Sequence, residues 1–342
     1  MSGKPNSWPV IGHTHVVAYL QHVLKTNALV HAYVFIGPQH VGKTTVADLF
    51  ISRLLCAAPS ENQLPCGTCI HCRHILTHSH PDCIDIVRNT DEETGTVASW
   101  ISVEQVRSLQ NQLHAKPFLA ERKVVRIFDA DRLSTEAANS LLKALEEPGP
   151  GTVFVLMTSR AGDVMPTILS RCQAVYFTPV PHATMLQALG EQYDAKKKAE
   201  TLAAIAHGCP GIAIRYMQEP EALEAMLAKA HECLALHRLD RPQQLLRGVA
   251  GKEITRQQAR EQLALWQLLL RDLLLLHHGQ SETLTFVALR TELEAIAQHY
   301  TPHQLTELLE DTNQLEAYID ANVSPKWILE SLILQLPTTF SV

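Results

Sequence analysis

The chain has 342 residues, a formal net charge of −6 and 46% hydrophobic residues. This composition excludes a disordered chain, and the acidic balance argues against independent binding of duplex DNA, because duplex binders are usually basic. Aromatic residues make up only 6%, which argues against a surface that binds single strands by base stacking. The most apolar stretch, 263–276, is too short and too charged to span a bilayer. We therefore expect a cytoplasmic, non-membrane protein of about two or three domains.

Apolar runs and helical patterns alternate along the first half of the chain. Apolar residues at helical spacing predict helices at 44–55, 103–113 and 135–147. Short apolar runs predict strands at 34–36, 85–87, 124–128, 153–157 and 174–177. Near-continuous apolar strands that alternate with helices indicate a parallel sheet buried in an α/β domain.

The strand pattern ends near residue 180, and helical patterns follow. Short helices are expected over 182–232, around a break at Gly208-Cys209-Pro210-Gly211. Longer helices are expected at about 253–278, 283–299, 302–321 and 324–335. The pattern predicts an α/β domain over 1–180, a small helical domain over 181–235 and a helical bundle over 236–342. The apolar stretch 263–276 must be buried, either inside this bundle or against a partner.

A phosphate-binding loop is predicted at Gly37-Pro38-Gln39-His40-Val41-Gly42-Lys43-Thr44, which fits the pattern G-x-x-x-x-G-K-[ST] between a strand and a helix. The glycines let backbone N–H groups approach phosphates, and the helix N-terminus adds its dipole. In this pattern Lys43 binds the β- and γ-phosphates and the Thr44 hydroxyl ligates Mg²⁺. Thr45, the next residue, is also expected at the nucleotide site. We therefore predict a site for ATP or ADP with Mg²⁺.

A second part of the nucleotide site is expected where the strand at 124–128 ends. P-loop nucleotidases hold Mg²⁺ with an acidic residue there, and Asp129 has that position. Many P-loop ATPases place a glutamate just after this residue, but here Ala130 has no proton acceptor. If the strand continues, Asp131 shares a face with Asp129 and lies near the site. The pattern predicts nucleotide binding with weak or absent hydrolysis, and a helix N-cap is the alternative role for Asp129.

Four cysteines follow the predicted helix 44–55 in the pattern Cys56-x9-Cys66-x2-Cys69-x2-Cys72. Four thiolates at such spacing suit tetrahedral Zn²⁺ in a closed, structural site. An iron–sulfur cluster uses the same ligands, a C-x-x-C pair can be redox-active, and His71 and His74 are alternative ligands. We predict a zinc module over 56–72, inserted in the α/β domain, that folds with its metal.

Further motifs accompany these sites. They are His31-Ala32-Tyr33, Asn139-Ser-Leu-Leu-Lys143-Ala-Leu-Glu-Glu-Pro148 and Ile168-Leu-Ser170-Arg171-Cys172. With the phosphate-binding loop and the four cysteines, they resemble the bacterial clamp-loader branch of the AAA+ superfamily, which includes the delta-prime and gamma/tau subunits of DNA polymerase III. The resemblance is strong over 8–180 and weaker in Trp266-x4-Arg271-Asp272 and Asn322-Val-Ser-Pro325. It implies an AAA+ P-loop domain, a helical lid and a helical collar.

The resemblance also implies roles for two further residues. Arg171 matches an arginine finger, which projects into the ATP site of a neighbouring subunit and stabilises charge on the γ-phosphate. A structural ion pair is the alternative role for Arg171. Thr158 matches the polar sensor at the end of the strand 153–157, and capping of that strand end is its alternative role.

Two departures from the family favour delta-prime over gamma/tau. The acidic run contains no glutamate, and Gly211 stands where the hydrolysing members have an arginine that contacts nucleotide. The resemblance thus implies a stator in a hetero-pentamer with gamma/tau motor and delta subunits, acting on a sliding clamp and primer–template DNA through the complex. Such a chain is a component of the DNA polymerase III holoenzyme without catalytic turnover of its own. An active gamma/tau-type motor and a zinc-containing AAA+ repair or transport ATPase are the alternatives.

Overall fold

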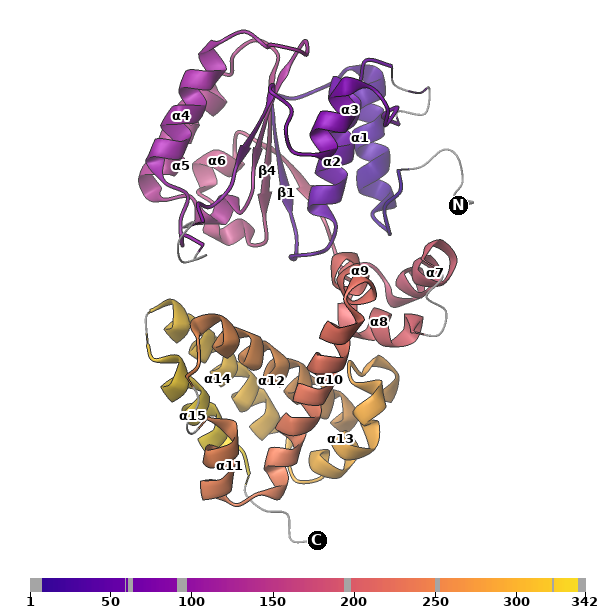
Figure 1. The fold of residues 1–342 in the computed structure, drawn as a ribbon, viewed down its shortest axis with the longest axis vertical. Coiled ribbons are helices and arrows are strands. Elements are labelled where there is room, and N and C mark those ends of the chain that lie inside the picture. Colours follow the sequence, from indigo (N-terminus) through magenta and orange to yellow (C-terminus); the bar gives the residue numbers. More distant parts are fainter. Residues whose placement is uncertain are drawn as a thin grey trace. The chain divides into compact units, whose positions relative to one another are not determined.

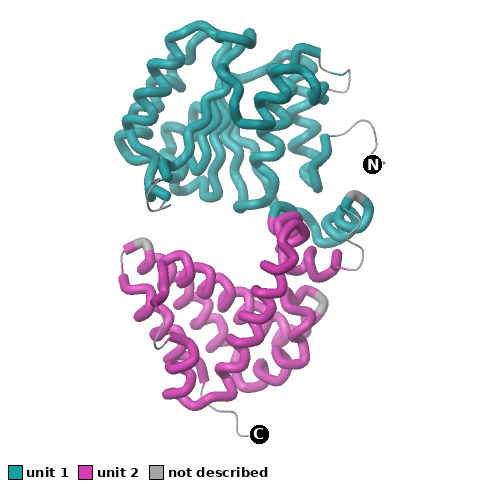
Figure 2. The backbone as a smooth tube through the Cα atoms, viewed as in Figure 1, with its two compact units in different colours: residues 1–194, 208–211 teal, residues 195–207, 212–342 magenta. Residues whose placement is uncertain are grey.

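The structure of the chain, a computed structural model, describes residues 8–58, 60, 64–90, 97–193, 198–249, 253–321 and 323–337. It divides into two compact units, which Figure 2 colours separately. Unit 1 comprises Met1–Asp194 and Gly208–Gly211, and unit 2 comprises Ala195–His207 and Ile212–Val342. Asn322, a residue of the weaker family pattern, lies outside the described residues. Within these residues, no helix has the length and hydrophobicity needed to cross a membrane.

Unit 1 is built around a parallel sheet. Its strands are β1 (Ala32–Ile36), β2 (Cys83–Ile86), β3 (Lys123–Ile127), β4 (Thr152–Thr158) and β5 (Gln173–Tyr176), in the order β2-β3-β4-β1-β5. β1, β3 and β4 are buried along their whole length, which explains their near-continuous apolar sequences. At the end of β1, Ile36 lies between Thr158 of β4 and Tyr176 of β5. Because all strands are parallel, the loops after β1, β3 and β4 meet at one edge of the sheet.

Helices cover both faces of this sheet. They are α1 (Thr14–Thr26), α2 (Lys43–Leu55), α3 (Ile70–Leu76), α4 (Val103–His114), α5 (Thr135–Glu146) and α6 (Pro166–Leu169), and α7 (His182–Gln192) follows after the last strand. Figure 1 shows α4 and α5 on one face and α1, α2 and α3 on the other. Val106 and Leu109 of α4 and Leu141 of α5 belong to the core on their side. The strands and helices expected before residue 180 are all present, with ends displaced by one or two residues.

Unit 2 is helical throughout its described part. Its helices are α8 (Ala199–Ala206), α9 (Pro210–Gln218), α10 (Pro220–Ala235), α11 (Arg241–Gly248), α12 (Arg256–His277), α13 (Arg290–Ala297), α14 (Pro302–Asp320) and α15 (Pro325–Gln335). The first two residues of α9, Pro210 and Gly211, belong to unit 1. The apolar stretch 263–276 forms most of α12, and its side chains Trp266, Leu270 and Leu273 are buried in the core of the bundle. Of the two expected explanations for this stretch, burial inside the bundle is the one observed. The parallel sheet covered by helices and the helical region after it confirm the predicted α/β domain followed by a helical region.

Candidate functional site

The phosphate-binding loop leaves β1 at the edge of the sheet where β4 and β5 also end. The first glycine of the loop packs against the chain after β5, because a Cβ on Gly37 would lie 2.3 Å from the carbonyl oxygen of Phe177. Gly42, at the N-cap of α2, has a φ of 115°, which strongly favours glycine. The loop pattern therefore forms the strand–loop–helix element that the sequence predicts.

Lys43 closes this loop into a ring. Its Nζ donates hydrogen bonds to the carbonyl oxygens of Gly37 at 2.6 Å and Pro38 at 2.7 Å. Burial lowers the pKa of Lys43, while Cys209, Asp129 and Asp131 oppose this shift through their negative charge when ionised. Those three residues therefore lie close enough to the lysine to affect its charge state.

The first turn of α2 exposes the two predicted threonines. The side chains of Thr44 and Thr45 are accessible to solvent beside the loop. The Thr44 hydroxyl contacts only the sulfur of Met157 among the hydrogen bonds described for it, at 3.8 Å. A sulfur is a weak acceptor, so this hydroxyl is available to a harder ligand such as Mg²⁺.

Two residues outside the loop bind its backbone carbonyls. His13, the buried N-cap of α1, places Nε2 2.8 Å from the carbonyl oxygen of Val41. The backbone N–H of Gly211 donates to the carbonyl oxygen of His40 at 2.9 Å. His13 belongs to no recognised motif of the sequence, and Gly211 was expected only as the position of a missing arginine.

The acidic strand end differs in one respect from the prediction. β3 ends at Ile127, and a short 3-10 helix follows over Ala130–Arg132, because Asp129 adopts a left-handed conformation with a φ of 48°. The strand therefore does not continue, and alternation along it cannot place Asp131. Asp129 makes no side-chain capping bond, so the N-cap alternative is not observed. Its carboxylate instead accepts a hydrogen bond from Arg88 Nε at 3.1 Å.

Thr158 and Asp131 meet directly. The Thr158 hydroxyl donates to Asp131 Oδ1 at 2.6 Å, and both side chains are buried or nearly so. The same hydroxyl oxygen accepts from the backbone N–H of Arg160 at 3.0 Å, which caps the end of β4. Thr158 therefore performs the capping role of the alternative interpretation and also links β4 to the acidic turn.

Arg171 lies on an exposed turn after α6. Its Nη2 donates to Glu146 Oε1 at 2.5 Å, and its Nη1 donates to the carbonyl oxygen of Thr167 at 3.0 Å. The Arg171 side chain is 36% exposed and that of Glu146 is 50% exposed. This is the ion pair of the alternative interpretation, but exposed pairs contribute little to stability. The guanidinium can therefore leave Glu146 at small cost.

The four predicted metal ligands come together. Their sulfur atoms all lie within 4.8 Å of one another, and the sulfurs of Cys66 and Cys72 are 3.9 Å apart. Tetrahedral Zn²⁺ with bonds of about 2.3 Å needs sulfurs about 3.8 Å apart, so the cluster fits this ion. The backbone N–H of Cys66 donates to the sulfur of Cys56 at 3.3 Å, and that of Cys69 to the sulfur of Cys66 at 3.3 Å. Such bonds favour the thiolate form that binds metal.

The pKa values of these thiols depend on the same contacts. Backbone N–H groups of Cys69 and Thr68 lower the pKa of Cys66 to about 6. Burial raises the pKa of Cys72. The two alternative histidine ligands are engaged elsewhere, His71 with His80 at 2.9 Å and His74 with Ser79 at 3.1 Å. Among the described residues the cysteines alone form the metal-binding group.

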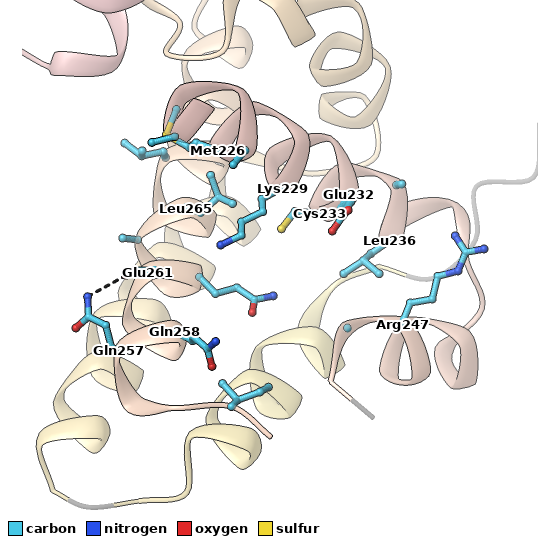
Figure 3. A pocket seen from close by; sticks show the side chains of 18 of the residues that line it. Met226, Lys229, Glu232, Cys233, Leu236, Arg247, Gln257, Gln258, Glu261 and Leu265 are labelled. Atoms are coloured by element: carbon cyan, nitrogen blue, oxygen red, sulfur yellow. Dashed lines mark hydrogen bonds between the residues drawn. The ribbon is translucent and has the colours of Figure 1, made fainter. Parts of the chain in front are cut away.

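Unit 2 contains a separate cavity of about 1290 Å³ between α10, α11 and α12. Figure 3 shows Lys229 and Glu232 on α10, Arg247 on α11 and Glu261 on α12 around it, so both signs of charge line it. Glu261 accepts a hydrogen bond from Gln257 at 3.0 Å. All predicted site residues belong to unit 1, so the cavity is distinct from the candidate nucleotide and metal sites.

Comparison with known proteins places the chain in a family. A family described as DNA polymerase III, delta subunit, matches residues 12–181, and one described as DNA polymerase III, delta subunit, C terminal, matches residues 241–338. A DNA polymerase III subunit delta′ from Bacillus subtilis is 26% identical over 325 residues, which are 94% of this chain and 95% of that protein. The chain belongs to the delta-prime family of DNA polymerase III subunits. The resemblance inferred from the motifs is thereby confirmed.

Members of the tau/gamma group are also similar to this delta-prime family chain. Subunit tau of Bacillus subtilis is 29% identical over 234 residues, which are 66% of this chain and 40% of that protein. Subunit tau/gamma of Haemophilus influenzae is 35% identical over 180 residues, which are 53% of this chain and 25% of that protein. The chain thus spans less than half the length of these two relatives.

The solved structures that the chain resembles have low sequence identity to it. A gamma subunit-related protein from Thermotoga maritima has a TM-score of 0.44 at 19% identity and covers 92% of this chain and 97% of its own. A RuvB variant from the same organism has a TM-score of 0.40 at 17% identity and covers 61% of each chain.

Proposed function

We propose that this chain is the delta-prime subunit of a DNA polymerase III clamp loader, a stator that binds ATP or ADP with Mg²⁺ without hydrolysing ATP. It assembles with tau/gamma motor subunits and a delta subunit into a hetero-pentamer, and acts on a sliding clamp and primer–template DNA through that complex. The family and the names of the relatives, which are delta′, tau and tau/gamma subunits of DNA polymerase III, support this assembly. The helical bundle over 236–342 is its collar domain, after a lid domain over 181–235.

The loop and its lysine support nucleotide binding. Lys43 Nζ lies 2.6 Å from the carbonyl oxygen of Gly37 and 2.7 Å from that of Pro38, so its ammonium stands beside the loop that would bind the phosphates. The Thr44 hydroxyl and the Asp129 carboxylate are the residues that would hold Mg²⁺, which neutralises phosphate charge when bound. Arg88 already pairs with Asp129, so the arginine and the ion compete for this carboxylate.

A single observation carries the absence of hydrolysis. Ala130 has no proton acceptor, and its side chain is packed in the core at 2% exposure. The nearest acidic alternative, Asp131, already accepts a hydrogen bond from the Thr158 hydroxyl, and its carboxylate lies 3.7 Å from Arg132 Nε. Neither of these two positions presents a free carboxylate to an attacking water, and such a carboxylate activates water in this class.

Arg171 is the group that this chain offers to a neighbour. It is exposed on its turn and bound to Glu146 by a pair that water screens. A guanidinium supplied in trans stabilises the charge that develops on a γ-phosphate. We assign Arg171 this role at the ATP site of a motor subunit.

The cysteine cluster is assigned a structural zinc ion. Four thiols close enough for tetrahedral coordination leave no ligand position for substrate, as in structural zinc sites. The ion fixes the segment between α2 and β2, and the binding free energy contributes to folding of this module.

Binding and turnover measured on the purified chain test the proposal. We expect saturable binding of ADP and ATP with Mg²⁺, lost in Lys43→Ala, and no ATP turnover above background in either protein. If wild type hydrolyses ATP and Lys43→Ala does not, the stator assignment is contradicted and the motor alternative is favoured. The intact phosphate-binding loop also fits that alternative. Absence of binding would contradict the nucleotide assignment.

A further inference from the structure

The backbone carbonyls of a phosphate-binding loop need hydrogen-bond donors from outside the loop. In a planar trans peptide the N–H and C=O groups point in opposite directions. A peptide that directs its N–H inward to a phosphate therefore directs its carbonyl outward. An outward carbonyl that is shielded from water needs a donor, because an unpaired buried polar group destabilises the conformation that contains it.

His13 supplies a donor to one such carbonyl. Its Nε2 lies 2.8 Å from the oxygen of Val41, and since a carbonyl only accepts, Nε2 carries the proton. The ring is buried at 6% exposure and lies edge-on to Phe177 with centroids 5.0 Å apart. Burial also lowers the pKa of His13, which favours the neutral ring. The donor is therefore held in a fixed place by packing.

Gly211 supplies a donor to the adjacent carbonyl. It is the second residue of α9, where backbone N–H groups have no partner within the helix, and its N–H lies 2.9 Å from the oxygen of His40. A Cβ at this position would lie 2.9 Å from the same oxygen and 3.2 Å from the Cβ of His40. The close approach therefore requires glycine. Gly208 fixes the start of the same turn against the backbone of Val180.

We propose that His13 and Gly211 are positioning residues of the phosphate-binding loop. His13 orients the peptide between Val41 and Gly42, and Gly211 orients the peptide between His40 and Val41. The N–H groups of Gly42 and Val41 are thereby directed to the phosphates before nucleotide arrives. This inference rests on the nucleotide binding proposed above. It assigns Gly211 a role in orienting the loop, whereas the family resemblance implied only that an arginine is missing at this position.

Matched variants separate the hydrogen bond of His13 from its packing. His13→Gln keeps an N–H donor at similar reach, whereas His13→Phe keeps an aromatic ring against Phe177 without a donor. We expect His13→Phe to bind ADP with Mg²⁺ on the order of tenfold more weakly than wild type, the range for one hydrogen bond lost at a shielded acceptor. His13→Gln should remain within about threefold of wild type, since the donor is retained.

The second pair of variants tests Gly211. Gly211→Ala should weaken binding on the order of tenfold, because the added Cβ forces the N–H away from His40. Gly190→Ala in α7 is the control, since a Cβ at Gly190 meets nothing within 4 Å. Thermal unfolding of the nucleotide-free proteins establishes that each variant is folded.

Isothermal titration with ADP and Mg²⁺ gives distinct outcomes. The inference is supported if wild type binds ADP and Lys43→Ala does not. It also requires weaker binding in His13→Phe and Gly211→Ala and preserved binding in His13→Gln. Wild-type affinity in both His13→Phe and Gly211→Ala would overturn it and leave the proposed function intact. Equal loss in His13→Gln and His13→Phe would overturn the donor role of His13. If wild type itself does not bind, the nucleotide assignment fails, and this inference fails with it.

Discussion

Arg126, a buried cation of β3, is expected to contribute strongly to the stability of unit 1. Arg126 is 1% exposed and donates to both carboxylate oxygens of Asp85, at 2.6 Å each, and to Asp48. Replacing it with methionine in Arg126→Met removes the ion-pair partner of Asp48 and leaves Asp85 with only His78 as a cationic partner, at 3.2 Å. Both carboxylates are only about a quarter exposed. Breaking such a pair costs about 3 kcal/mol. For a unit of this size that corresponds to a fall in Tm of roughly 6–12 °C.

Differential scanning calorimetry measures this change, and further variants separate its causes. Arg126→Lys should lose about half as much, because an ammonium cannot bind Asp85 through two parallel bonds. Adding Asp48→Asn and Asp85→Asn to Arg126→Met should restore much of the loss, because the unpaired charges are gone. Arg290→Ala, which removes an exposed pair with Glu294, is the control and should shift Tm little. A Tm for Arg126→Met within about 2 °C of wild type would refute the reasoning.

Three further outcomes are expected. Elemental analysis should find zinc in the wild type and in Cys83→Ser but not in Cys66→Ser, and zinc in Cys66→Ser would contradict the assigned ligand set. Burial lowers the pKa of His207 and of His237 to about 4, so the unfolded chain binds more protons and unit 2 should lose stability as the pH falls from about 6.5 to 4. A melting profile that is flat over this range would exclude that account, and a combined His207→Asn and His237→Gln variant should flatten it. Arg171→Ala should change unfolding free energy by at most about 0.5 kcal/mol, and a loss of several kcal/mol would make the residue structural.

The sequence predicted well those features that depend on local pattern. The apolar runs of β1, β3 and β4 are buried on both faces, so they appear as short, near-continuous apolar runs between helical patterns. The phosphate-binding loop and the four cysteines depend on residue type and short spacing, and both form as predicted. The helix α3 was not predicted, because it begins within the cysteine pattern and its seven residues make too few turns for a helical period.

Contacts between distant residues could not be predicted in this way. The sequence could not show whether the strand continues to Asp131, because the left-handed conformation of Asp129 is not encoded by an apolar period. The bond from Thr158 to Asp131 and the pair of Arg171 with Glu146 join residues that are 27 and 25 positions apart. His13 was missed for the same reason, since its partner lies 28 positions away on the loop after β1. Only the fold brings these groups together.

The most direct test of the central claim is ATP hydrolysis by a reconstituted clamp loader that contains this chain. Tau/gamma and delta subunits would be combined with wild type, Arg171→Ala or the control Arg290→Ala, and single-turnover hydrolysis would be followed with clamp and primed DNA. An arginine finger contributes about 10³-fold or more to the site it serves. We predict that the complex with Arg171→Ala assembles as a full pentamer but lacks the hydrolysis phase of one motor site. The complex with Arg290→Ala should hydrolyse ATP like the wild-type complex. Unchanged hydrolysis with Arg171→Ala in a fully assembled complex would contradict the claim.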